Sequence, residues 1–137
     1  MTGILADANI KGHLDFLFDL LTSKAWIEFW QALGIRYATF KEIGLTADDT
    51  DDVVWQACQD HGYGYVLITS NRNQKGAHSL EATIRQWATT DSLPVLTLAD
   101  AERFRNDRAY AERVVASLLE ILFDIDCYRG SGRLYLP

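Results

Sequence analysis

The sequence has few of the residues that mark several large protein classes. Two cysteines, Cys58 and Cys127, occur among 137 residues, too far apart for a disulfide framework or a zinc pattern. Two prolines are present, and no stretch rich in proline, glycine or serine suggests an interdomain linker. No apolar run approaches the ~20 residues that cross a bilayer. We therefore expect one domain over residues 1–137, in the reducing cytoplasm, without a membrane partner or a secretory leader.

Basic residues are outnumbered by acidic ones. The 13 lysines and arginines face 19 aspartates and glutamates, which gives a formal net charge of −6. This balance argues against strong nonspecific binding to nucleic acid, which needs many phosphate-neutralising side chains. It leaves open a nucleic-acid enzyme with a local basic rim, and an acidic metal site. The chain also has no Walker-type lysine loop, no G-x-G-x-x-G and no G-x-S-x-G, which weakens nucleotide-binding and α/β-hydrolase interpretations.

Strand-like and helix-like patterns alternate along the whole chain. Strands are predicted at 4–6, 35–40, 65–69, 94–98 and 133–136, and helices at 11–33, about 51–61, 80–88 and 100–123. Thr22 and Ser23 are expected to split the first helical stretch, with Ser23 as the N-cap of its second part. The alternation predicts a three-layer α/β/α sandwich with a mainly parallel central sheet.

Polar residues follow two of the predicted strands, where open parallel sheets form their sites. Asp7 closes the first strand in ILADANI, and Thr69-Ser70-Asn71 follows the apolar run of YVLIT. Asp51 opens a helix in DDVVWQACQDHG. Each has a plainer interpretation, because Asp7 and Asp51 also suit helix caps or first turns. Thr69 and Asn71 also suit a strand end and a turn.

Together these features resemble the PIN-like nuclease superfamily. There the first strand ends in an Asp, a later Asp begins an apolar helix that ends at Gly, and the next strand ends in Thr-x-Asp. The matching positions are Asp7 and Asn9 in ILADANI, Asp51, Val54, Ala57 and Gly62 in the helix, and Thr69-Ser70-Asn71. The resemblance covers about residues 3–100. It is closest to short bacterial PIN-like proteins, many of which are linked to toxin–antitoxin pairs.

The resemblance implies a metal-dependent ribonuclease that acts on single-stranded RNA, with a toxin-like role. Asp7 and Asp51, or its neighbour Asp52, would hold Mg²⁺ or Mn²⁺, because these ions prefer carboxylate oxygens. Thr69 and Asn71 would complete a polar catalytic pocket, and Glu42 is a further acidic candidate. The expected substrate contacts are Asn9, Ser70, Arg72 and Lys75.

Asn71 departs from the family pattern, because an amide stands where the third acid is expected. An amide oxygen binds metal without adding negative charge, so metal binding and hydrolysis should both be weaker. The alternative function is therefore a PIN-like module with little or no activity. It would bind a partner protein, such as an antitoxin-like chain, or form a homodimer. Trp26 and Trp30, two of four tryptophans, are expected in the core or at such an interface.

Overall fold

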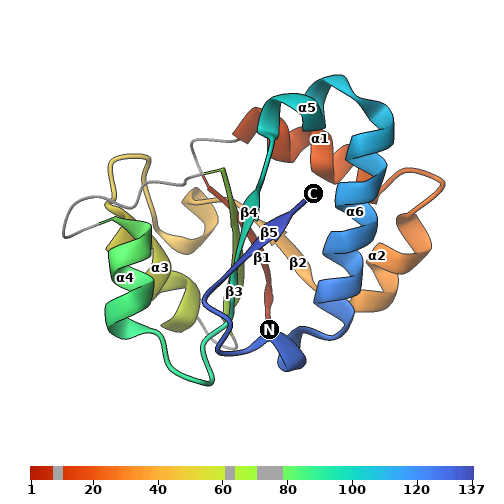
Figure 1. Ribbon diagram of the computed structural model, residues 1–137. Coiled ribbons are helices and arrows are strands. Elements are labelled where there is room, and N and C mark those ends of the chain that lie inside the picture. The colour runs from red at the N-terminus through yellow and green to blue at the C-terminus, as the bar shows by residue number, and fades with distance from the viewer. Residues whose placement is uncertain (8–10, 61–63, 71–78) are drawn as a thin grey trace.

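A five-stranded sheet lies between two layers of helices in the computed structural model (Figure 1). The structure describes residues 1–7, 11–60, 64–70 and 79–137. Within these ranges, neighbouring strands of the sheet run parallel to each other. The predicted three-layer α/β/α sandwich with a mainly parallel sheet is therefore confirmed.

The strands are short and mostly apolar. They are β1 (Gly3–Ala6), β2 (Arg36–Ala38), β3 (Tyr65–Thr69), β4 (Val95–Leu98) and β5 (Arg133–Leu136), and they lie in the order β2-β1-β3-β4-β5. Every residue of β3 and β4 is buried, because helices cover both faces of the central strands. Strand β2 is shorter than the predicted 35–40. Phe40 already has helical backbone angles, and a 3-10 turn, η2 (Lys41–Ile43), follows it.

The helices divide between the two faces of the sheet (Figure 1). One face carries α3 (Asp51–Asp60) and α4 (Leu80–Trp87); the other carries α1 (Lys11–Leu21), α2 (Ile27–Leu33), α5 (Ala101–Asn106) and α6 (Arg108–Phe123). A 3-10 turn, η3 (Ile125–Tyr128), follows α6. Successive strand side chains point to opposite faces. Val66 therefore packs in the core on the α6 side, and Leu67 packs in the core on the α3 side.

The first helical stretch is interrupted, as predicted, but not by the predicted cap. Helix α1 ends at Leu21 and α2 begins at Ile27, with Trp26 at the N-cap position and no side-chain cap. The prediction that Ser23 caps the second helix is wrong. Its hydroxyl donates to the carbonyl of Leu20 at 2.6 Å and so closes the end of α1, because the chain needs further residues to turn before α2 begins.

The predicted helix over 100–123 is also divided. It forms α5 and α6, which meet at Asp107. The Asp107 carboxylate accepts a hydrogen bond from the backbone N–H of Tyr110 at 3.1 Å and caps α6. The apolar periodicity continues through this break, so it could not reveal the new N-cap.

Candidate functional site

The carboxyl ends of β1 and β3 lie next to each other in the middle of the sheet. The chain passes from β1 to β2 on one side and then places β3 on the other side of β1. The register pairs Ala6 with Ile68, so Asp7 and Thr69 come next on these neighbouring strands. Open parallel sheets bind their ligands beside the point where the strand order reverses. Asp7 and Thr69 flank that point.

Two hydrogen bonds hold Asp7 at this edge. Its backbone N–H donates to the carbonyl of Ile68 at 3.0 Å, and its Oδ2 accepts from the Thr69 hydroxyl at 2.7 Å. Thr69 is fully buried, and a hydrogen bond to a carboxylate is stronger than one between neutral groups. The structure thus brings together two residues that the sequence predicted for the site. Capping of the next helix by Asp7 would involve residues 8–10, which lie outside the described residues.

The charge of Asp7 acts on the layer formed by α3. Burial raises the pKa of the Cys58 thiol to about 12, and the Asp7 carboxylate contributes to this shift. Cys58 is almost completely buried within α3. A thiol with so high a pKa stays protonated at neutral pH, so Cys58 is a packing group and not a nucleophile. Helix α3, which contains Cys58, therefore lies near the Asp7 carboxylate.

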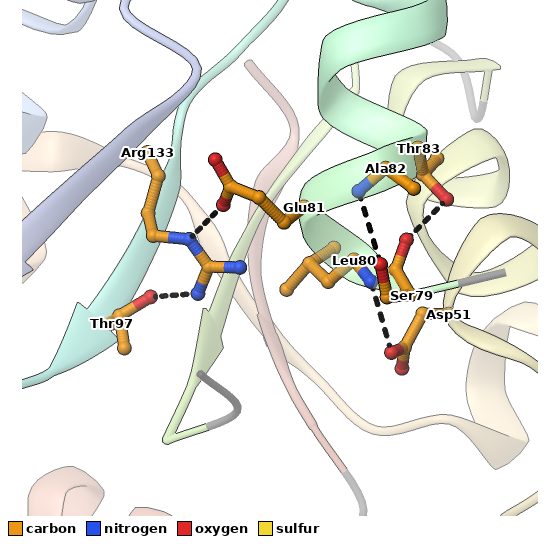
Figure 2. Close-up of polar contacts among 8 residues, drawn as sticks. All are labelled: Asp51, Ser79, Leu80, Glu81, Ala82, Thr83, Thr97 and Arg133. Carbon is orange, nitrogen blue, oxygen red and sulfur yellow. Dashed lines mark hydrogen bonds and ion pairs between the residues drawn. The ribbon is translucent and has the colours of Figure 1, made fainter. Parts of the chain in front are cut away.

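Asp51 joins the first turns of α3 and α4. Its Oδ2 accepts from the backbone N–H of Leu80 at 3.1 Å (Figure 2). Ser79 caps α4, because its side-chain oxygen accepts from the N–H of Ala82 at 3.1 Å. The N-terminal ends of two helices thus meet at Asp51, where their N–H groups favour a negative charge. The half-buried Asp51 carboxylate is therefore an anchor between helices and not only a solvated first-turn charge.

The other two acidic candidates make local contacts. The Asp52 carboxylate is half-buried and accepts a short hydrogen bond from the hydroxyl of Thr50. Glu42 is exposed, forms an ion pair with Arg36 at 3.3 Å and accepts from the hydroxyl of Thr39 at 3.0 Å. These contacts join residues a few positions apart in the chain. They give no support for either acid as a metal ligand.

Of the remaining predicted pocket and substrate-contact residues, the structure describes one and leaves four undescribed. Ser70 is described and half-buried, directly after β3. The predicted residues outside the described ranges are Asn9, Asn71, Arg72 and Lys75. The third position of the predicted pocket and its basic residues therefore stay predictions.

The described part of the chain offers no ready-made cage of three or more side chains for a metal ion. Within 1–7, 11–60, 64–70 and 79–137, no three or more His, Cys, Asp or Glu side chains are grouped so that they could hold a metal ion. A cage of three carboxylates is therefore not formed by these residues. Mg²⁺ commonly takes one or two carboxylates together with waters and substrate phosphates. The Asp7 carboxylate and the Thr69 hydroxyl beside it offer oxygen ligands of the kind that Mg²⁺ binds. They do not offer the nitrogen and sulfur ligands that zinc prefers.

Sequence reasoning missed a buried polar group on the face of the sheet that α3 and α4 cover (Figure 1). Arg133 on β5 forms an ion pair with Glu81 on α4 and donates to the hydroxyl of Thr97 on β4 (Figure 2). In the sequence RLYL, the alternation assigns Leu134 and Leu136 to the core and Arg133 to the opposite, polar face. One signal was present: Thr97 interrupts the apolar strand VLTL.

Comparison with protein-family models, with curated proteins and with solved structures gives no match. In the described part of the chain, none of the helices combines the length and the apolar character that crossing a membrane requires. The PIN-like resemblance therefore rests on the sequence motifs. The contact between Asp7 and Thr69 is the structural feature that bears on the predicted site.

Proposed function

We propose that this chain is a PIN-like ribonuclease that uses Mg²⁺ or Mn²⁺ to cleave single-stranded RNA. The observation that carries this proposal is the hydrogen bond between Asp7 and Thr69 beside the strand-order reversal. A carboxylate at that position lies where open α/β sheets bind their ligands. The substrate class and the toxin-like role come from the sequence resemblance.

The residues of the chain have distinct roles in this proposal. Asp7 is the principal metal ligand, and Thr69 fixes the direction of its carboxylate through the 2.7 Å hydrogen bond. Asp51, the first residue of α3, accepts a hydrogen bond from the start of α4 and is the second carboxylate. Arg72 and Lys75 neutralise substrate phosphates. When bound, the metal ion polarises a phosphoryl oxygen and lowers the pKa of the attacking water.

A cytoplasmic location belongs to the same proposal. Cys58 is buried and Cys127 is exposed, and both are free thiols in the structure. Free thiols are typical of proteins in a reducing compartment. An antitoxin-like protein is the partner that the resemblance suggests for a toxin-like ribonuclease in that compartment.

The test compares purified wild-type protein with Asp7→Asn and with Asp60→Asn as a matched control. Asp60 is the last residue of α3, at the opposite end of that helix from Asp51, and its carboxylate accepts from Gln56 within the helix. Mn²⁺ binding is measured by calorimetry, and cleavage is measured with a fluorescent single-stranded RNA. We expect Asp7→Asn to lose Mn²⁺ binding and to cleave at least about 100-fold more slowly, because it removes the principal ligand charge. Asp60→Asn should behave as wild type. Cleavage that persists unchanged in Asp7→Asn would show a contaminating nuclease and refute the proposal.

A groove between α3 and α4 favours the second candidate, a module for protein–protein interaction or dimerisation. The groove has a volume of about 380 Å³ and is lined by Asp52, Val53, Gln56, Ala57 and Trp87. Trp87 is 57% exposed and Val53 is 44% exposed. Exposed aromatic side chains are enriched at protein interfaces. By contrast, Trp30 and Trp55 are buried in the core.

Sedimentation equilibrium tests this second candidate with wild-type protein and Trp87→Gln. If a homodimer forms through the groove, wild-type protein should show a monomer–dimer equilibrium, and Trp87→Gln should shift that equilibrium toward monomer because it removes an exposed aromatic side chain from the groove. The matched control is Phe29→Gln, which alters another exposed aromatic residue on α2, in the opposite layer. Equal effects of the two substitutions would exclude the groove as the specific interface.

A further inference from the structure

The side chain of Arg133 is buried on the α4 side of the sheet, with only 6% of it exposed. Its Nε lies 3.3 Å from Glu81 Oε2, and its Nη1 donates to the hydroxyl of Thr97 at 2.8 Å (Figure 2). One guanidinium group therefore links β5, β4 and α4. Burial of a charge is unfavourable unless it is paired, and apolar residues often replace such pairs without loss of stability. The position therefore calls for an explanation other than core stability.

The contact of Arg133 with Thr97 lies on the face of the sheet that carries Thr69 and Asp7. Thr97 pairs in register with Thr69 on the neighbouring strand, so the two side chains lie on the same face of the sheet, with the strands about 4.8 Å apart. Both threonines are fully buried. Thr69 in turn donates to Asp7. Arg133, Thr97, Thr69 and Asp7 thus form a polar row across β5, β4, β3 and the end of β1.

The contact of Arg133 with Glu81 leads toward Asp51. Glu81 follows Leu80 in the first turn of α4, and the backbone N–H of Leu80 donates to Asp51. The side chain of Glu81 is 27% exposed, and Arg133 holds it against the sheet. Because adjacent residues in a helical turn move together, the ion pair also fixes the direction of the Leu80 N–H. Arg133 therefore contacts the turn of α4 that holds Asp51, and its other partner, Thr97, lies in register beside Thr69, the hydrogen-bond partner of Asp7.

We propose that Arg133 is a positioning residue for Asp51, because it holds Glu81 in the first turn of α4, directly beside the Leu80 N–H that donates to Asp51. This inference rests on the proposed function, because it concerns Asp51 as a metal ligand. Residues that orient metal ligands change metal affinity about 10- to 100-fold when they are mutated, although they do not touch the metal. Position 133 lies outside the part of the chain that resembles the PIN-like family, so that resemblance does not supply this role.

The experiment measures Mn²⁺ affinity by calorimetry and the Leu80 amide proton shift by NMR. The variants are Arg133→Met and, as a matched control, Arg129→Met. Arg129 also forms an ion pair, with Asp126 at 2.8 Å, and donates to the carbonyl of Asp91 at 2.8 Å, but these contacts involve no candidate carboxylate. We expect Arg133→Met to bind Mn²⁺ about tenfold more weakly and to shift the Leu80 amide proton. Arg129→Met should change neither quantity.

The double variant Arg133→Met with Glu81→Gln keeps the test valid if the single variant does not fold, because it leaves no buried unpaired charge. Affinity and Leu80 shift like those of wild type, in a folded variant, would overturn the positioning role alone. Wild-type protein that binds no Mn²⁺ would overturn the proposed function, and the positioning role with it. The two failures are therefore distinguished by the wild-type measurement.

Discussion

Thr69 donates a 2.7 Å hydrogen bond to Asp7 across the two central strands of the sheet. The two residues are 62 positions apart in the chain. They meet because β1 and β3 are parallel neighbours in register, and their polar residues begin where the apolar strands end. The contact unites the carboxylate and the hydroxyl at the place where the strand order reverses.

Replacement of Thr69 by valine should remove this hydrogen bond and keep the side-chain shape. We expect a loss of about 1.5–3 kcal/mol in the free energy of unfolding, because the lost partner is a charged group. Thr69→Ser should retain most of the stability. Urea denaturation gives the comparison, with Thr22→Val as the control. Thr22 is exposed and its hydroxyl donates to the carbonyl of Phe18 at 2.8 Å. Equal losses in Thr69→Val and Thr22→Val would contradict the prediction.

The free energy of unfolding should decrease at acid pH as Glu112 on α6 becomes protonated. The indole N–H of Trp26 donates to the Glu112 carboxylate, and Arg108 pairs with it at 2.9 Å. Both contacts lower the pKa of Glu112 below its ordinary value of 4.5. A carboxyl group with a lowered pKa in the folded state stabilises the protein above its unfolded pKa. That contribution is lost as the pH falls through the folded pKa.

Glu112→Gln should therefore be less stable than wild type at pH 7, and the difference should shrink as the pH falls below 4.5. Denaturant titrations between neutral and acid pH measure this difference. Glu120→Gln is the control, because Glu120 lies on the same helix and is exposed. A stability difference that stays constant with pH would show that Glu112 contributes only through packing.

Gly3 should not tolerate a side chain. A Cβ atom at Gly3 would lie 2.2 Å from the carbonyl oxygen of Arg36, its partner on β2. Gly3→Ala should lower the free energy of unfolding by about 1–3 kcal/mol, because the two backbones must move apart. In Gly12→Ala, on α1, the nearest atom would be the flexible Arg105 guanidinium at 3.3 Å. That variant should be neutral or more stable by up to about 1 kcal/mol. Thermal denaturation separates the two, and similar losses would contradict the prediction.

Helix boundaries were harder to predict than the elements themselves. Ser23 and Asp107 are both good capping residues, yet Ser23 closes α1 while Asp107 begins α6. Local sequence favours a cap at either residue, because each side chain can accept from a nearby backbone N–H. The choice depends on where the chain must turn to pack the next helix on the sheet. The interruption within 100–123 was therefore missed.

The amino-acid sequence by itself determined the type and order of the elements, because apolar periodicity specifies which faces are buried. It also placed Asp7 and Thr69 at strand ends. Only the tertiary structure decided which strands are neighbours, since strand order depends on how the connections cross the sheet. It also decided that the side chain of Arg133 is buried, because α4 covers the face on which the alternation of RLYL had left a charge. Local patterns describe one segment at a time, whereas these contacts join segments far apart in the chain.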